Sequence, residues 1–288
     1  MKGIILAAGA GTRLSPATFP ISKILLPIYD RPMIYYPLST LMMAGIDDIL
    51  VITNETDINN FKRTLGDGSQ FGIKIEYAIQ YIQRGIADAF IIAKDWIAGE
   101  KVALILGDNI FYGKDLNSLF SKAPSIDKGA VIFGYPVPDP ERFGVIGFDD
   151  NNNVTSLEEK PQKPKSNYAA VGIYFYDQKV CSFAETLKPS KRGELEVTDL
   201  NIEYLKRDDI SVLLFNDDTE WIDAGTFDSL LNASIFIANK EKELGKKILC
   251  PEIIAYENGF VTKEAMIEWI KKNKDNEYYK GILKEISD

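Results

Sequence analysis

Short apolar segments alternate with segments of helical periodicity through the first half of the chain, and this alternation constrains the fold most. Strand patterns lie at 2–8, 48–53, 73–79 and 101–109, with helix patterns between them at 32–45, 55–68 and 86–99. Strands separated by helices of this length predict a parallel sheet with right-handed crossovers. Ligands bind such sheets in the crevice at the carboxyl ends of the strands.

The pattern changes in the middle of the chain. Strand patterns at 130–137, 143–150, 153–161 and 168–176 are joined by turns rich in Asp, Asn and Pro, which predicts a mixed-sheet insertion forming the second wall of a cleft. Helical patterns follow at 178–187 and 195–207, then strands at 210–215 and 220–225, and a long helix from about 226 to 244. The tail from about 262 predicts two helical stretches. With no repeat, low-complexity segment or linker, we expect one domain.

Composition sets limits on function. The chain is 45% hydrophobic, has two cysteines and carries a net charge of −9, which argues against a nucleic-acid surface. No apolar run is long enough to span a membrane, and the short apolar start resembles a core strand more than a secretory signal. Cys181 and Cys250 are far apart in apolar surroundings, so we expect buried free thiols and a cytoplasmic protein.

The chain contains no histidine. This excludes a Ser-His-Asp triad, a histidine-ligated zinc site and a histidine general base. Chemistry must therefore depend on carboxylates, lysines, arginines or a hard metal ion, or on a nucleophile that is already ionised.

A loop of small residues follows the first strand, and two cations, Arg13 and Lys23, come after it. Small residues let a ligand approach the backbone closely, and exposed N–H groups in such a loop suit an anion. We therefore expect this loop to bind phosphate, with a plain turn as the alternative.

Three phosphate-binding loops can be compared with this one. The P-loop sequence G-x-x-x-x-G-K-[ST] does not occur. The dinucleotide fingerprint fits Gly9 and Gly11, but Leu14 occupies its third glycine position. The fingerprint also needs an acidic residue about 20 residues on, at the end of the second strand, and the nearest candidate there, Glu55, lies about twice as far away. The third option is the G-x-G-T-R loop of sugar nucleotidyltransferases.

Two aspartates follow apolar runs that predict buried strands: Asp108 after LILG, and Asp223 after Trp221 and Ile222. Two carboxylates meeting in a crevice suit Mg²⁺, which takes few protein ligands and completes its shell with water and substrate phosphates. Turn or helix capping is the alternative for each aspartate alone. Trp221 fits either core packing or stacking on a ligand at the mouth of a cleft.

A lysine stands at the end of another predicted strand, in the sequence LEEKP. Lys160 either forms a solvated ion pair with its neighbouring glutamates or clamps a phosphate, with Glu159 accepting hydrogen bonds from sugar hydroxyls. The charged segment 192–199, RGELEVTD, enters a helix, and we assign Thr198 and Asp199 to helix capping.

These segments together resemble the glucose-1-phosphate thymidylyltransferases, a family of sugar nucleotidyltransferases, over essentially the whole chain. The matching segments occur in order: KGIILA, GTRL, SK, LLPIYDRPMIYYPLSTLMMAGI, LGDGSQFGI, LILGDNIFYG, DPERFGV, LEEKP, PKSNYA, GIYFYD, KPSKRGELEVTDLN and DSLL. The resemblance implies an α/β fold: a Rossmann-like core with a mixed, mostly parallel central sheet, a sugar-binding subdomain and C-terminal helices. The expected parts are a nucleotide-binding half at about 1–110 plus 215–244, the sugar-binding subdomain at about 111–214, and helices at about 245–288.

The resemblance also implies roles for individual residues. The catalytic residues would be Arg13, Lys23, Lys160, Asp108 and Asp223, with Mg²⁺ held by the two aspartates. The nucleotide side would comprise Leu6, Ala8, Gly9, Gly11, Thr12, Arg13, Gln80, Gly85 and Asp108, with Gln80 and Gly85 at the pyrimidine edge. The sugar side would comprise Gly144, Glu159, Lys160, Asn167, Tyr168, Val171 and Trp221.

The implied reaction joins a sugar 1-phosphate, most simply glucose 1-phosphate, to dTTP and releases pyrophosphate. The second pKa of a phosphate monoester is about 6, so the attacking oxygen is largely ionised at neutral pH and needs no general base. The missing histidines are therefore no obstacle, because positioning and electrostatics carry such a transfer. The family usually forms homotetramers and is often inhibited by a downstream deoxysugar nucleotide at a second site.

Several positions depart from the usual family sequence: Ala8, Ile24, Arg84, Asp88, Lys114, Val171 and Ala224. Glutamines at 24 and 88 would offer amide donors, and a threonine at 171 would make the sugar pocket more polar. The changes therefore leave open another hexose 1-phosphate, and UTP in place of dTTP, since one methyl group is worth about 10- to 200-fold in discrimination. An inactive regulatory or scaffold homologue is a further alternative, although all five catalytic residues are present.

Overall fold

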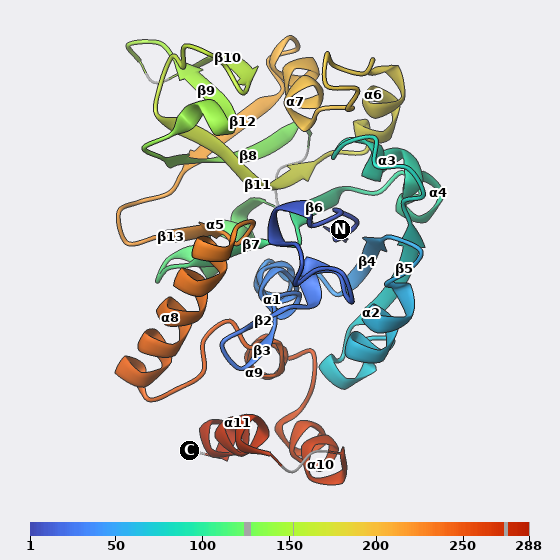
Figure 1. Cartoon of the computed structure of the whole chain (residues 1–288), viewed down its shortest axis with the longest axis vertical. Coiled ribbons are helices and arrows are strands. Elements are labelled where there is room, and N and C mark those ends of the chain that lie inside the picture. Colours follow the sequence, from blue (N-terminus) through green and yellow to red (C-terminus); the bar gives the residue numbers. More distant parts are fainter. Residues whose placement is uncertain (124–127, 152, 274–275, 288) are drawn as a thin grey trace.

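The computed structural model describes residues 1–123, 128–151, 153–273 and 276–287. In this part of the chain a nine-stranded sheet forms the centre of the molecule (Figure 1). Its main path runs in the order β10 (Val154–Glu159), β9 (Gly144–Phe148), β11 (Tyr168–Tyr176), β6 (Val102–Leu106), β1 (Lys2–Leu6), β4 (Asp48–Thr53) and β5 (Lys74–Ile79). Off this path, β8 (Ala130–Pro136) pairs with β11 and with β12 (Ile210–Leu214).

The first half has the predicted parallel arrangement. Strands β6, β1, β4 and β5 are parallel neighbours, so their carboxyl ends share one edge of the sheet. Alternate residues face opposite sides: Ile5 packs in one hydrophobic core and Ile4 in the other. The connecting helices are α1 (Tyr35–Met43), α2 (Ile58–Leu65), α3 (Asp88–Ile92) and α4 (Lys94–Ile97).

The helix predicted over 86–99 is divided into α3 and α4 at Ala93, where the backbone leaves helical geometry at ψ 1°. Hydrogen bonds from Ala93 N to Ala89 O and from Ile97 N to Ala93 O still cross the division. The difference from the prediction is therefore a local irregularity in one continuous helical segment.

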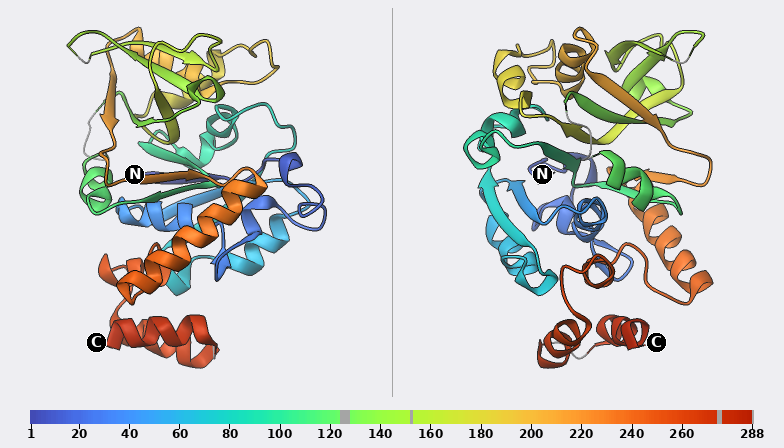
Figure 2. Two further views of the ribbon diagram at one scale, coloured as in Figure 1. Left: turned by 60° about the vertical axis from the view of Figure 1, so that its left-hand side comes forward. Right: turned by 180° about the vertical axis from the view of Figure 1, so that it is seen from behind.

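The middle strands do not form a separate wall, because β11 joins them to the central sheet. Its second half pairs with β6 and β8, and Ala169 pairs with Val145 of β9. Helices α6 (Val180–Thr186) and α7 (Val197–Leu205) lie with these strands at one end of the molecule (Figure 2). The predicted cleft therefore forms over one continuous sheet.

The strand predicted at 220–225 is β13 (Glu220–Asp223), which pairs with β7 (Asn109–Tyr112) outside the central sheet. Strand β7 and the pair β2 (Pro27–Ile28) and β3 (Arg31–Pro32) were not predicted. The sequence patterns also missed helices α5 (Leu116–Lys122) and α9 (Pro251–Glu257). The predicted long helix is α8 (Phe227–Leu244), which starts with a capping box between Thr226 and Ser229. Among the described helices, none has the length and apolarity needed to cross a bilayer.

The C-terminal helices α10 (Lys263–Asn273) and α11 (Glu277–Ser287) lie beneath the sheet domain, next to α9 (Figures 1 and 2). Glu252 of α9 is completely buried at this junction. Its Oε2 accepts hydrogen bonds from the Tyr278 hydroxyl at 2.9 Å and the Cys250 thiol at 3.1 Å, while Oε1 has no partner among the described residues. Burial raises the pKa of the Glu252 carboxyl above its ordinary value.

We expect the Glu252→Gln variant to change how stability depends on pH. Because the folded-state pKa of Glu252 is raised, the folded protein binds this proton more tightly than the unfolded chain does. The protonated Glu252 carboxyl therefore contributes its full stability below the pKa it has in the unfolded chain, and this contribution is lost as pH rises through its pKa in the folded protein. The glutamine side chain of the variant does not titrate, so the variant does not lose stability in this way. Urea denaturation at a series of pH values should show the variant gaining stability relative to wild type as pH rises, and parallel curves would contradict the assignment.

Candidate active site

A cavity of about 640 Å³ opens at the carboxyl edge of the parallel strands. Its walls come from distant segments of the chain, as the right-handed crossovers predict. The lining residues are Thr12, Arg13, Ile86, Leu106, Asp108, Asn109, Arg142, Phe143, Gly144, Glu159, Lys160, Ala170, Gly172, Tyr174, Arg192, Glu194, Val197, Thr198, Trp221 and Asp223. The opening loop and the residues Asp108 and Asn109, which follow β6, therefore face one site.

The opening loop turns sharply after β1 to bring Arg13 into the cavity. Gly11 has a left-handed backbone (φ 63°), and its carbonyl accepts a hydrogen bond from Thr18 at 3.0 Å. The Arg13 guanidinium then lies against Gly225, where an added Cβ would come within 2.6 Å of Nη2 and 3.0 Å of Asp223 Oδ1. Arg13 and Asp223 are thus neighbours across the site.

Lys23 forms an ion pair with Asp108 Oδ2. A short helical turn, Lys23–Leu25, aims this lysine, and the Ser22 side chain accepts a hydrogen bond from Ile24 N at its start. Ile24 itself is buried against Gly107 and does not line the cavity. Ile24 therefore packs beneath Gly107 and does not face a ligand in the cavity.

Asn109 connects three parts of the site. Its Oδ1 accepts hydrogen bonds from the Trp221 indole at 2.6 Å and from Gly172 N at 3.2 Å, which leaves its Nδ2 to donate to Asp108 Oδ1 at 3.1 Å. Trp221 also meets Phe143 edge-on, with ring centroids 5.3 Å apart. Trp221 therefore belongs to the cavity wall and is held in a fixed orientation.

Asp223 lies close to Asp108, and Ala224 N donates to the Asp108 carbonyl at 2.9 Å. Burial, and then the negative charge of Asp108, raise the pKa of the Asp223 carboxyl. Two neighbouring carboxylates, one buried and one half-buried, suit a divalent cation, which would neutralise their repulsion. No group of three or more Cys, Asp or Glu side chains with metal-binding geometry occurs among the described residues, so substrate and water would have to complete the shell.

On the opposite wall of the cavity, a hydrogen-bond network centred on the Glu159 carboxylate is suited to accepting hydrogen bonds from hydroxyl groups. Glu159 accepts hydrogen bonds from the Thr198 hydroxyl at 2.5 Å and from Arg192 Nη1 at 3.3 Å. Gly144 lies against this network, because a Cβ there would come within 2.7 Å of Thr198 Oγ1. The assignment of Thr198 to helix capping was wrong: Glu196 is the N-cap of α7, and Thr198 is bonded to Glu159.

Lys160 follows directly in a left-handed backbone conformation (φ 43°) that is uncommon for a residue with a side chain. Its amide donates to the Phe143 carbonyl at 2.9 Å, and its ammonium lies 3.9 Å from Glu159. Such local strain is typical of functional sites.

The other predicted site residues do not line this cavity. On the nucleotide side, Leu6, Ala8, Gly9, Gln80 and Gly85 lie at or near the ends of β1 and β5. On the sugar side, Tyr168 packs edge-on against Phe148, the Asn167 carbonyl accepts from Val137 N, and Val171 is buried in the core. Ala170 and Gly172 line the cavity instead, so Val171 points to the opposite face of β11. Their predicted substrate contacts stay predictions.

The lining residues that were not predicted as site residues include Asn109, Arg142, Arg192 and Thr198. The charged sequence RGELEVTD marked two of them without indicating which groups they meet. For Asn109, the only indication in the sequence was its position directly after Asp108. Arg142 forms an ion pair with Asp139 at the cavity mouth.

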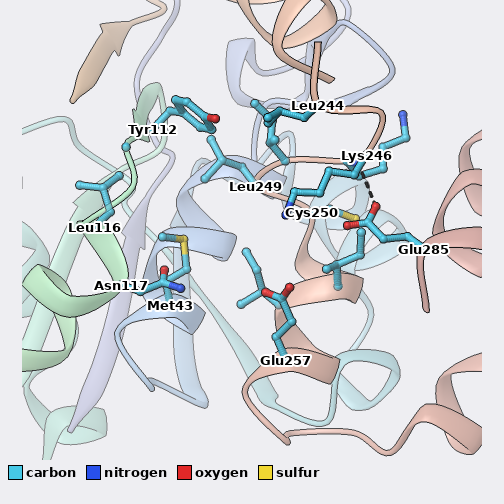
Figure 3. Close-up of a pocket in the computed structure, with 15 residues that line it drawn as sticks. Met43, Tyr112, Leu116, Asn117, Leu244, Lys246, Leu249, Cys250, Glu257 and Glu285 are labelled. Carbon is cyan, nitrogen blue, oxygen red and sulfur yellow. Dashed lines mark hydrogen bonds between the residues drawn. The ribbon is translucent and has the colours of Figure 1, made fainter. Parts of the chain in front are cut away.

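A second, smaller cavity of about 190 Å³ lies on the other side of β7 (Figure 3). Tyr112, Leu116, Leu249 and Cys250 contribute to its wall, and Lys247 N donates to Glu285 at its rim at 2.9 Å. Strand β7 therefore has Asn109 in the first cavity and Tyr112 in the second.

The fold and the cationic, doubly acidic site define a nucleotidyltransferase, and the Nucleotidyl transferase family model matches residues 2–240. The chain belongs to this family, in the branch of the glucose-1-phosphate thymidylyltransferases. It is 49% identical over 284 residues to the glucose-1-phosphate thymidylyltransferase of Neisseria meningitidis, covering 99% of both chains. It is 51% identical over 266 residues to that of Mycolicibacterium smegmatis, covering 92% of both.

Two solved structures agree with this assignment. A Bacillus anthracis structure titled as a glucose-1-phosphate thymidylyltransferase, in complex with a sucrose, has a TM-score of 0.76 and 42% identity, covering 82% of this chain and 94% of that one. A UDP-glucose pyrophosphorylase complexed with UDP-glucose has a TM-score of 0.72 and 25% identity, covering 83% and 98%.

We expect the Asn109→Leu variant to lose stability. The change leaves the buried indole N–H of Trp221 and the Gly172 amide without an acceptor, at about 1–3 kcal/mol each. Urea denaturation should show a loss of roughly 2–5 kcal/mol. The exposed Asn117→Leu on α5 is the matched control and should stay within about 0.5 kcal/mol of wild type; equal stability of both variants would contradict the role of Asn109.

Proposed function

We propose that this chain joins glucose 1-phosphate to dTTP, giving dTDP-glucose and pyrophosphate, as a step of nucleotide-sugar biosynthesis. The observation that carries the proposal is the near full-length similarity to glucose-1-phosphate thymidylyltransferases. The cavity adds an independent argument, because it places Arg13, Lys160 and an Asp108–Asp223 pair around one space.

The geometry suits an in-line transfer. The ionised phosphate oxygen of the sugar 1-phosphate attacks the α-phosphorus, forming one P–O bond, and the bond to the bridging oxygen of the β-phosphate breaks. The negative charge leaves with pyrophosphate, so no proton has to be moved. A histidine-free site is therefore sufficient, provided that it holds two polyanions together.

The residues divide this work by position. Arg13 and Lys23 are placed for the triphosphate, beside the backbone of the opening loop. Lys160 and Arg192, on the opposite wall, are placed for the sugar phosphate, and Glu159 accepts from sugar hydroxyls when they displace Thr198 or Arg192.

Asp108 and Asp223 would hold Mg²⁺, whose charge would stabilise the negative charge that develops on the α-phosphoryl group. In this structure the Lys23 ammonium forms an ion pair with Asp108 Oδ2. Lys23 would then turn from Asp108 to the phosphates when the ion is bound.

The finer substrate choice is open to a direct test. UTP remains an alternative to dTTP, and another hexose 1-phosphate an alternative to glucose 1-phosphate. Pyrophosphate release from four nucleoside triphosphates against a panel of hexose 1-phosphates decides among these. The absence of turnover with every pair would instead favour an inactive regulatory or scaffold homologue.

We expect Arg13→Ala to lower turnover roughly 100- to 1000-fold, because it removes a positioned cation from the transition-state charge. The fold should persist, since Arg13 is exposed at the surface of the cavity. Steady-state pyrophosphate release and circular dichroism measure the two effects, and Lys165→Ala on the exposed surface is the control. A normal rate in the Arg13 variant would exclude the proposed role.

We also propose that the protein acts in the cytoplasm as a homotetramer. Both cysteines are free, which suits a reducing compartment. Phe227, Leu231 and Ile235 form an exposed apolar stripe along α8, with 49%, 59% and 49% of their surfaces accessible. Stripes of this kind often mark interfaces.

Sedimentation velocity should find a tetramer for wild type and a smaller species for Leu231→Glu, because a charge would be buried in the contact. A monomeric wild type would contradict the proposed assembly. Assembly unchanged by the substitution would place the interface elsewhere.

A further inference from the structure

A polar cluster at the end of β5 lies outside both cavities. Gln80 and Asp88 are buried, and Gln80 Nε2 donates to Asp88 Oδ2 at 2.9 Å. Arg84, in the loop before α3, donates to Oδ1 at 2.7 Å. The cluster is thus a buried amide and a buried carboxylate, with a cation on the other oxygen of the carboxylate.

The carboxylate of Asp88 determines which way the Gln80 amide faces. A carboxylate only accepts hydrogen bonds, so it must face the NH₂ group of Gln80. The Gly85 carbonyl, 3.4 Å from the same nitrogen, favours the same orientation. No hydrogen bond to Gln80 Oε1 is found in the described part of the chain, and this oxygen is not among the fully buried atoms without a partner. It is therefore available as an acceptor.

The position of this oxygen relative to the phosphate loop follows from two hydrogen bonds. Gln80 N donates to the Thr53 carbonyl at 2.8 Å, which keeps Gln80 beside the carboxyl end of β4. Gln83 Nε2 donates to the Ala8 carbonyl at 2.8 Å, which ties the loop after β5 to the opening loop. The segment that carries Gln80 therefore lies beside the opening loop, within the reach of a nucleoside whose phosphates would be bound there.

We propose that Asp88 is a positioning residue for base selection, because it holds the Gln80 amide with its oxygen toward the bound base. This inference rests on the proposed nucleotidyl transfer and deepens it. Thymine and uracil carry an N3–H, which a Gln80 oxygen can accept. Cytosine carries a lone pair at N3, so two acceptors would face each other. The cluster selects nucleotides whose pyrimidine carries an imide N–H.

The Asp88→Asn variant tests the orientation with almost no change of shape. Arg84 is a cation and a donor, so it takes the new amide's oxygen and leaves the Asn NH₂ facing Gln80. Gln80 then turns over and presents its own NH₂ to the base. This removes the repulsion against cytosine and weakens the contact to thymine.

The experiment measures pyrophosphate release with glucose 1-phosphate and each of dTTP, dUTP and dCTP. We expect the dTTP-to-dCTP ratio of kcat/KM to fall at least about tenfold in Asp88→Asn. The dTTP-to-dUTP ratio should stay constant because both bases carry N3–H, and the KM for glucose 1-phosphate should also stay constant. A merely structural role for Asp88 would alter all these values together.

Arg84→Met is the matched control, since it removes the cation but leaves the carboxylate facing Gln80, and its dTTP-to-dCTP ratio should equal that of wild type. An unchanged ratio in a folded Asp88→Asn protein, or an equal fall in Arg84→Met, would overturn the inference. If Asp88→Asn does not fold, Gln80→Leu should lose the discrimination, and full discrimination in that variant would overturn it as well. A wild-type protein that is inactive with every nucleotide would instead overturn the proposed function, and this inference with it.

Discussion

The site depends on keeping two carboxylates next to each other, the buried Asp108 and the half-buried Asp223. Left alone they would repel, and the raised pKa of Asp223 reflects both its burial and that repulsion. Lys23 compensates one of them directly, and Arg13 lies close to the other. The arrangement would suit the divalent cation that we propose, and because the described residues offer no dedicated cage, substrate and water would supply most of the coordination.

An arrangement of fixed charges also explains how a chain without histidine performs a nucleotidyl transfer. Its nucleophile arrives ionised and its leaving group departs as an anion, so the protein's task is to hold charges at fixed distances. Rigidity therefore matters more than acid–base chemistry. Asn109 provides part of it, since one amide fixes the Trp221 indole, the backbone of β11 and the Asp108 carboxylate. Asp88 plays a comparable part for Gln80, one polar side chain fixing another.

The continuous sheet determines how the two walls of the cavity face each other. Strand β11 belongs both to the half that carries the opening loop and to the half that carries Glu159 and Lys160. The distance between the two walls is therefore set by strand pairing, which is stiff. Strand β7 extends from this site to the second cavity, so the two hollows share one structural element.

The sequence determined the parallel half-sheet, the small-residue loop after β1, and the candidates Asp108, Asp223 and Lys160, because each depends on a local pattern: periodicity, small residues after a strand, or a charged residue at a strand end. Only the tertiary structure decided which distant groups meet. It paired β13 with β7, bonded Thr198 to Glu159, and turned Val171 into the core while Ala170 and Gly172 face the cavity. Alternate residues of a strand point to opposite faces, and which face becomes a cavity depends on segments far away in the chain.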